Sequence, residues 1–170
     1  MTRVSYAIDG WGAGELWLDG PLVVELTHPH SSPLSSCYHG NTIGLVERLQ
    51  AYFDGEPDDF ADVELQLDWC TPFQRALLDA LRAVPYGETV TYGELAALAG
   101  RPGAARAAGT FCAQNRYAIV VPCHRVVAAD GLGGYGSLGL DYKRRLLRLE
   151  ALCARGPRTR LSVSRGGGAA

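Results

Sequence analysis

The segment Pro122-Cys123-His124-Arg125 places a cysteine directly before a histidine and an arginine. Cysteine reacts as the thiolate, so its ordinary pKa of about 8.5 must fall if it is to act as a nucleophile near neutral pH. A neighbouring histidine that accepts the thiol proton, in cationic surroundings, favours this ionisation. These residue types therefore predict a nucleophilic Cys123 with His124 as its base.

The same residues allow a second interpretation. Ala118–Val121 is a short apolar run that predicts a buried strand, and a free cysteine next to such a strand is often an inert core residue. Adjacent side chains of an extended segment point to opposite faces, so Cys123 and His124 would need a turn or a bridging water to interact. The spacing alone leaves both interpretations open.

Short helices are predicted on the N-terminal side of this segment. Thr71-Pro72-Phe73-Gln74 and Thr91-Tyr92-Gly93-Glu94 are both capping boxes, the first with proline at the first helical position. A third helix is expected from about Pro102, through Ala104–Ala108, towards Gln114. Two short helices joined by a tight turn that contains glycine have the outline of a helix-turn-helix.

Arg106 is the only charged residue of the third predicted helix, where small residues surround it: Ala104, Ala105, Ala107, Ala108 and Gly109. One interpretation is a tightly packed core helix. The other is a helix with a slim face that lies against DNA and carries one long cationic side chain. The helix by itself does not decide between them.

The first half of the chain predicts a small α/β module. Apolar runs at Val4–Ile8, Leu16–Leu18 and Leu22–Leu26 predict strands, and Thr42–Phe53 has the apolar spacing of a helix. The alternation of Val63–Leu67 predicts one more strand. We expect no catalytic residue in this half.

Charge divides the chain unevenly. From Met1 to Asp68 it has two arginines and twelve acidic residues, whereas from Trp69 onward it has fourteen Lys or Arg and six Asp or Glu. This favours a second half that meets a polyanion such as nucleic acid, although a merely dipolar protein is the alternative. No apolar stretch is long enough for a membrane helix and no signal-peptide pattern is present, so we expect a cytoplasmic protein.

Five cysteines with irregular spacing predict reduced thiols rather than a disulfide framework. His28, His30, Cys37 and His39 are residue types that suit zinc, but their spacing is loose. We interpret them as surface-loop residues and predict no metal, while the possibility of a site there stays open.

The segment around Cys123 resembles the active-site signature of the O6-alkylguanine-DNA alkyltransferases, or methylated-DNA–protein-cysteine methyltransferases. It reads Val120-Val121-Pro122-Cys123-His124-Arg125-Val126-Val127. Further segments fit that family in order and spacing: Thr71–Gln74, Pro85–Thr89, Thr91–Ala96, Gly103–Ala107 and Lys143–Glu150. The acidic first half resembles the family's variable N-terminal domain more weakly.

The resemblance implies an α/β N-terminal domain, a small sheet with a helix, over residues 1–68. A mainly α, winged helix-turn-helix-like C-terminal domain would follow over residues 69–153. The arginines and the glycine run of residues 154–170 predict a flexible tail. The resemblance also implies a monomer that binds double-stranded DNA through the minor groove.

The activity that the resemblance implies is direct reversal of DNA damage. An alkyl (methyl) group would pass from O6-alkylguanine in DNA to Cys123 after base flipping, in one irreversible turnover without a cofactor or metal. His124 would act as a water-bridged base for the thiol, oriented by Glu150, and Asn115 would brace the turn around the active site.

The resemblance assigns other residues to DNA and to the pocket. Arg106 would fill the place of the flipped base, and Tyr92 would crowd the phosphate of that nucleotide. The slim face with Ala104 and Ala105 would contact DNA. The loop that covers the pocket would contribute Tyr135 and Gly136. The phenol of Tyr135 would donate a proton to the departing base.

Departures from the family pattern lie beside the pocket. Arg116 stands where proline usually follows the asparagine, and the loop is one residue shorter before Tyr135 and one longer after it. The range of accepted adducts therefore stays open. Alternatives to alkyl transfer are a noncatalytic damage-binding module, a DNA-binding regulator and a cysteine hydrolase that uses Cys123 and His124.

Overall fold

An antiparallel sheet of three strands forms the beginning of the fold, in the computed structural model that describes residues 1–30 and 43–154. The strands β1 (Thr2–Ile8), β2 (Gly12–Asp19) and β3 (Leu22–Leu26) pair in the order β1-β2-β3. Both connections are tight turns with a glycine at positive φ, Gly10 and Gly20, a conformation that glycine adopts without steric cost. The three strands predicted in this region are confirmed.

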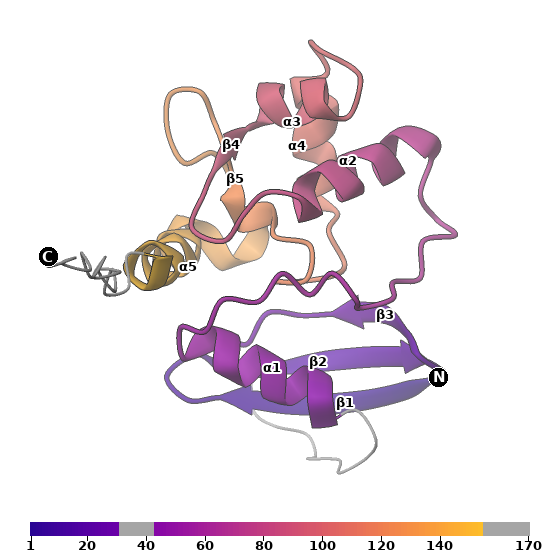
Figure 1. The fold of residues 1–170 in the computed structure, drawn as a ribbon, viewed down its shortest axis with the longest axis vertical. Coiled ribbons are helices and arrows are strands. Elements are labelled where there is room, and N and C mark those ends of the chain that lie inside the picture. The colour runs from indigo at the N-terminus through magenta and orange to yellow at the C-terminus, as the bar shows by residue number, and fades with distance from the viewer. Residues whose placement is uncertain (31–42, 155–170) are drawn as a thin grey trace, which may run out of the picture.

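The helix α1 (Ile43–Phe53) covers one face of this sheet (Figure 1). Its residues Leu49, Tyr52 and Phe53 are buried together with the inward-facing residues of the strands. The ring of Phe53 also lies 4.8 Å from that of Trp11, measured between centroids. The predicted helix is confirmed from Ile43 onward, and Thr42 lies outside the described residues.

The strand predicted over Val63–Leu67 is wrong. Only Leu65 forms a bridge, beside Val23 of β3, through backbone hydrogen bonds of 2.9 Å from Val23 to Glu64 and from Gln66 to Val23. The alternation that suggested a strand reflects the burial of Leu65 in an otherwise extended connection, which runs between the sheet and the helices that follow (Figure 1).

Helices dominate the rest of the chain: α2 (Pro72–Arg82), α3 (Tyr92–Leu98), α4 (Ala105–Ala113) and α5 (Gly139–Ala154). Both predicted capping boxes are confirmed, since Thr71 and Thr91 each accept from the third helical amide and receive the reciprocal side-chain bond. Ala154 is the last residue of α5 and not part of a tail. The remainder of the expected tail lies outside the described residues.

The segment around Cys123 is not a strand. Residues 118–121 form a turn in which Ile119 has φ of +67°, a strained conformation for a β-branched residue. The 3-10 helix η1 (Cys123–Arg125) and the short strand β5 (Val126–Val127) follow, and β5 pairs in parallel with β4 (Val90–Thr91). A second 3-10 helix, η2 (Gly136–Leu138), precedes α5.

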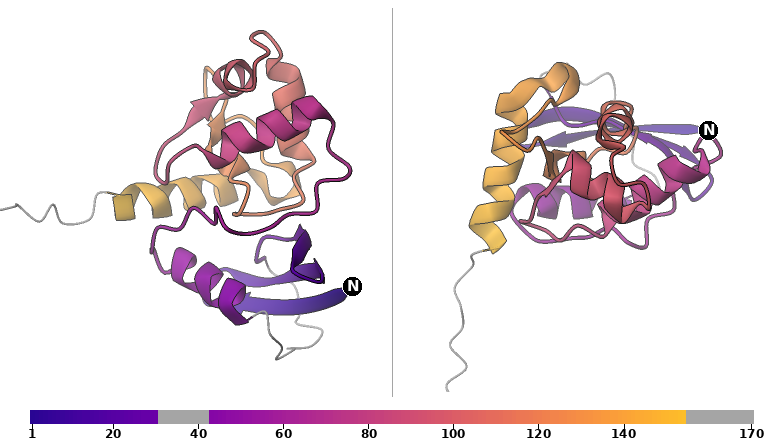
Figure 2. Two further views of the ribbon diagram at one scale, coloured as in Figure 1. Left: turned by 45° about the vertical axis from the view of Figure 1, so that its right-hand side comes forward. Right: turned by 90° about the horizontal axis from the view of Figure 1, so that it is seen from above.

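The sheet with α1 and the helices α2–α4 lie at opposite ends of the molecule, and α5 lies beside both (Figures 1 and 2). Side chains of α5 join the two ends. Arg145 donates to the Gly10 carbonyl at 2.6 Å and its guanidinium lies 3.7 Å from the centre of the Trp11 ring, while Tyr142 donates to the Pro29 carbonyl at 2.7 Å. None of the described helices is long and apolar enough to cross a membrane.

Candidate active site

The turn before Cys123 is held by the side chain of Asn115. Its Oδ1 accepts from the Tyr117 amide at 3.0 Å, so its Nδ2 faces the other way, donating to the Val121 carbonyl at 2.8 Å and to Cys123 Sγ at 3.2 Å. A donor directed at sulfur favours thiolate over thiol. Asn115 therefore shapes the turn and contacts the candidate nucleophile.

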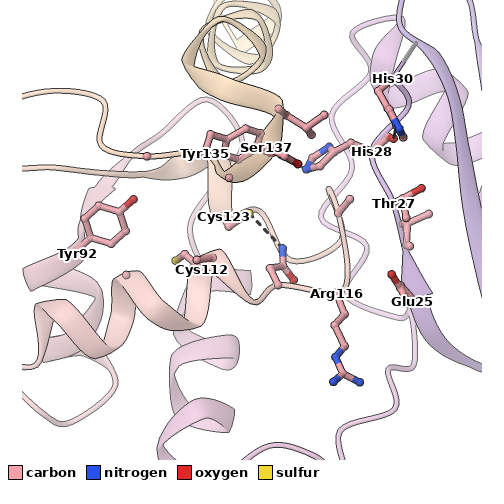
Figure 3. Close-up of a pocket in the computed structure, with 18 residues that line it drawn as sticks. Glu25, Thr27, His28, His30, Tyr92, Cys112, Arg116, Cys123, Tyr135 and Ser137 are labelled. Carbon is pink, nitrogen blue, oxygen red and sulfur yellow. Dashed lines mark hydrogen bonds between the residues drawn. The ribbon is translucent and has the colours of Figure 1, made fainter. Parts of the chain in front are cut away.

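A pocket of about 740 Å³ opens beside the Cys123 sulfur. Tyr92 and Cys112 lie on one side of it and Tyr135 lies above the thiol (Figure 3). Gly136 also lines the pocket, so two separate loops and α4 enclose the space in front of Cys123. Cys123 is part of the buried core, but it also lines this pocket, which favours the reactive interpretation over that of an inert core residue.

Behind Cys123 lies a buried polar cluster, which we define as His124, Glu150, Arg125 and Tyr52. Glu150 Oε1 is 2.7 Å from His124 Nε2, 2.9 Å from Arg125 Nη2 and 2.5 Å from the Tyr52 hydroxyl. Glu150 Oε2 accepts from Arg125 Nε at 3.0 Å and from the Gly87 amide at 3.0 Å. Both carboxylate oxygens are thus saturated with donors, as a buried charge requires.

This geometry fixes the tautomer of His124. Glu150 is an acceptor only, and its neighbour Tyr52 has a single proton, which it donates to Glu150. His124 Nε2 must therefore carry a hydrogen that it donates to Glu150, with the Tyr52 oxygen 3.2 Å away. His124 Nδ1 is left as the basic nitrogen and has no hydrogen-bond partner among the described residues.

The pKa directions refine the expectation for the thiol. Burial raises the pKa of Cys123, and the hydrogen bonds from Asn115 and Tyr135 and the charge of Lys143 oppose that rise without cancelling it. Burial also lowers the pKa of His124, against the influence of Glu150. Both directions favour the neutral thiol and the neutral imidazole, which is opposite to the lowering of the thiol pKa that a reactive Cys123 was expected to need.

Lys143 is a buried residue that sequence reasoning matched to the family without giving it a role. Its ammonium donates to the carbonyls of Val126 at 2.5 Å, Leu132 at 2.6 Å and Gly134 at 3.2 Å. It also lies about 6 Å from the centres of the Tyr92 and Tyr135 rings. Lys143 therefore ties down the loop that carries Tyr135 and places a positive charge near the thiol.

The residues expected to meet DNA lie on α4 and its N-terminus. Arg106 is exposed on α4, and within the described part of the chain it forms no ion pair. Ala104 is the N-cap residue and provides no side-chain hydrogen bond, and Ala105 begins the helix. Tyr92, at the start of α3, reaches the pocket from the side of α4 (Figure 3).

Residues of the first half, where we expected no catalytic residue, also lie at the site. Tyr52 belongs to the buried polar cluster, and the segment from Glu25 to His30 forms one wall of the pocket (Figure 3). His28 is not a surface-loop residue, because its Nε2 lies 2.7 Å from the Tyr135 hydroxyl. Among residues 1–30 and 43–154 no group of three or more His, Cys, Asp or Glu could hold a metal, while Cys37 and His39 lie outside those ranges.

Replacing Tyr52 with phenylalanine is expected to lower the free energy of unfolding by about 1.5–3 kcal/mol, because the hydroxyl donates to the buried charge of Glu150. Tyr142→Phe is the matched control, since its hydroxyl donates to a neutral carbonyl and its loss should cost about 1 kcal/mol. Urea titration of both variants measures the difference. Equal losses in the two variants would mean that Tyr52 contributes nothing through the charge of Glu150.

Known proteins resemble the chain over the residues that contain Cys123, His124 and Glu150. The sequence model of a family described as 6-O-methylguanine DNA methyltransferase, DNA binding domain, matches residues 72–152. A methylated-DNA–protein-cysteine methyltransferase of Mycolicibacterium paratuberculosis is 56% identical over 108 residues, which are 63% of this chain and 64% of that protein. One of Methanopyrus kandleri is 48% identical over 106 residues, 62% of this chain and 78% of that protein. The chain spans just under two thirds of the first curated relatives that it matches.

Solved structures resemble a larger part of the chain. The crystal structure of Mycobacterium tuberculosis OGT in complex with DNA has a TM-score of 0.75 and 39% identity, covering 89% of this chain and 93% of that one. The O6-methylguanine-DNA methyltransferase of Pyrococcus kodakaraensis has a TM-score of 0.68 and 26% identity, covering 88% and 99%. The similarity therefore includes the sheet with α1 as well as the helical part.

Proposed function

Since the chain belongs to the family of methylated-DNA–protein-cysteine methyltransferases, we propose that it repairs O6-alkylguanine in DNA by moving the alkyl group onto Cys123. The observation that carries this proposal is the position of the Cys123 sulfur, which faces the pocket with the His124–Glu150 pair directly behind it.

The proposed reaction is a single displacement. Cys123 loses its proton through a bridging water to His124 Nδ1, the nitrogen that the tautomer leaves basic. The thiolate attacks the alkyl carbon, and the carbon–sulfur bond forms as the carbon–oxygen bond breaks. Guanine leaves with the electron pair and takes up a proton from the Tyr135 phenol, which solvent then reprotonates. The product is a thioether, which thiol exchange does not reverse, so one protein repairs one base.

The arrangement of the buried polar cluster supports proton transfer from Cys123 to His124. Transfer of a proton to His124 creates an imidazolium, and the Glu150 carboxylate at 2.7 Å stabilises that charge. Arg125 holds Glu150 with two nitrogens and also donates to the Val84 carbonyl at 2.6 Å. Arg125 is thus a supporting residue, and Asn115 stabilises the developing thiolate from the other side.

DNA would be bound by residues 69–153 as a winged helix-turn-helix domain, with residues 1–68 as the N-terminal domain. Support comes from the packing of α3 against α4 and from the basic charge of the second half. Ala104 and Ala105 leave the first amides of α4 uncovered by side chains, which suits a phosphate. Arg106 would enter the minor groove and replace the flipped guanine, while Tyr92 would press on its phosphate.

We also propose that the protein is a monomer that acts in the cytoplasm without a cofactor. A noncatalytic damage-binding module is disfavoured because the chain has a cysteine, Cys123, that lines the pocket. A cysteine hydrolase leaves Arg106 without a role.

Titration tests the proposed function. Increasing amounts of a duplex that contains O6-methylguanine are mixed with a fixed amount of protein, and restored guanine is measured after nuclease digestion. We expect a plateau at one guanine per protein, because the thioether is stable. Repair that continues past the plateau would indicate a turnover enzyme, and no restored guanine would exclude alkyl transfer.

Arg106→Ala is expected to slow transfer from duplex DNA roughly tenfold or more, since unstacking a base costs a few kcal/mol. Transfer from the free base O6-benzylguanine should keep its wild-type rate, because that substrate needs no flipping. Arg144→Ala removes the same charge from the exposed surface of α5 and controls for general phosphate attraction. Equal slowing on both substrates would remove the base-flipping role of Arg106.

A further inference from the structure

His28 connects the N-terminal half to the loop over the pocket. Its Nε2 lies 2.7 Å from the hydroxyl of Tyr135, and its ring packs against the rings of Tyr135 and Tyr142 at 5.4 and 5.3 Å between centroids. Figure 3 shows His28 and Tyr135 side by side above Cys123. A residue that follows the last strand of the N-terminal sheet therefore contacts the side chain that covers the thiol.

The direction of this hydrogen bond follows from counting protons. Burial lowers the pKa of His28 to about 3 and raises that of Tyr135, so the pair is a neutral imidazole and a neutral phenol with one proton each. If the phenol donated to Nε2, the imidazole proton would lie on Nδ1, which is shielded from solvent and has no partner among the described residues. An unpaired buried N–H group is rarely tolerated.

The opposite direction leaves Nδ1 without a hydrogen, so that no N–H group of His28 is buried without an acceptor. If Nε2–H donates to the Tyr135 oxygen, the phenol keeps its own proton for another acceptor. The Cys123 sulfur is a suitable acceptor, because it lines the same pocket and lies below Tyr135 (Figure 3). The proximity of Tyr135 also favours the thiolate of Cys123. In this direction the phenolic proton is free to turn towards the sulfur, whereas in the other direction it is used in the bond to His28.

We propose that His28 is a positioning residue that donates to Tyr135 and turns the phenolic proton towards the Cys123 sulfur and the substrate in front of it. This inference rests on the proposed alkyl transfer. Lys143 holds the backbone of the same loop through the Leu132 and Gly134 carbonyls, and His28 fixes the side chain of Tyr135. The N-terminal half thereby supplies a residue that acts on the chemistry through its neighbour.

Two substitutions of His28 separate this role from packing. Phenylalanine preserves the size of the ring and removes the donor, whereas glutamine is a poorer ring substitute but places an N–H donor near the position of Nε2. If His28 acted only by packing, His28→Phe would be the milder change. If it acts as a donor, His28→Gln will be the milder change, so the two roles predict opposite orders.

The experiment measures single-turnover methyl transfer from an O6-methylguanine duplex to the full-length chain, with duplex affinity and urea unfolding measured for every variant. We expect His28→Phe and Tyr135→Phe each to slow transfer roughly ten- to a hundredfold, the range for a hydrogen bond to a charged or charging group. The double variant should be no slower than the slower single variant, because both changes break one connected unit. His28→Gln should recover most of the rate.

Other outcomes are equally clear. Transfer that is as fast in His28→Phe as in His28→Gln, or losses that multiply in the double variant, would overturn the positioning role while leaving alkyl transfer intact. Absence of transfer in the wild-type protein would instead refute the proposed function, on which this inference depends.

Discussion

Replacing Glu150 with glutamine is expected to lower the free energy of unfolding by about 3–5 kcal/mol, the usual cost of removing one partner of a buried ion pair. Glu150 is fully buried and accepts from Arg125, His124, Tyr52 and the Gly87 amide. Glutamine has similar size but no charge, so the Arg125 guanidinium would remain buried without a counter-ion. Urea unfolding of the variant measures the loss.

Asp141→Asn is the matched control on the same helix. Asp141 pairs with Arg144 at 2.6 Å, but both side chains are largely exposed, and such pairs contribute about 0–1 kcal/mol. A loss in Glu150→Gln as small as that in Asp141→Asn would contradict the view that the buried polar cluster depends on a buried charge.

The stability contributed by Glu150 should also depend on pH. Burial alone raises the pKa of Glu150, but the hydrogen bonds from His124 and Arg125 outweigh it and hold the folded pKa well below the ordinary 4.5. A depressed carboxyl pKa stabilises the fold above the unfolded pKa, and that contribution is lost as pH falls towards the folded pKa. The difference between wild type and Glu150→Gln should therefore be constant near neutrality and shrink below about pH 4.5.

Cys123→Ser is expected to abolish alkyl transfer while duplex binding persists, because a hydroxyl cannot ionise near neutral pH as a thiol can. Burial favours the neutral thiol of Cys123, so the reaction also needs His124 as a base. Transfer is measured as label passing from methylated duplex to protein, and binding as a gel shift of the same duplex.

Cys70→Ser, on a residue away from the pocket, should transfer at the wild-type rate. Cys112 also lines the pocket, and burial raises its pKa to about 12. Unlike Cys123, which accepts from Asn115, Cys112 has no side-chain donor on its sulfur among the described residues. Transfer that survives in Cys123→Ser and disappears in Cys112→Ser would show that Cys112, and not Cys123, is the alkyl acceptor.

Local elements were predictable because their signals are local. The capping boxes at Thr71 and Thr91 define helix starts through residues three apart, and Asp-Gly turns separate the strands of the sheet. The Ala118–Val121 strand failed because apolar residues are buried equally well in a turn. The bracing amide of Asn115 and the left-handed Ile119 that produce this turn are tertiary features.

The contributions of Tyr52 and His28 to the site were not predictable for a similar reason. Tyr52 lies on the apolar face of α1 between core residues, and 72 residues separate it from His124. Nothing near Tyr52 in the sequence distinguishes its hydroxyl from that of an ordinary core tyrosine. His28 was likewise ambiguous, because the contact that gives it a role joins residues 107 positions apart. The Cys123 motif, by contrast, is contiguous and was readable directly.

The intact mass of the protein before and after mixing with an equimolar duplex containing one O6-methylguanine, followed by peptide mapping, tests alkyl transfer to Cys123 most directly. We predict a gain of one methyl group per protein, located on the peptide that contains Cys123, together with restored guanine in the DNA. An unchanged mass with the duplex still bound, or a methyl group on another residue, would contradict the proposed function.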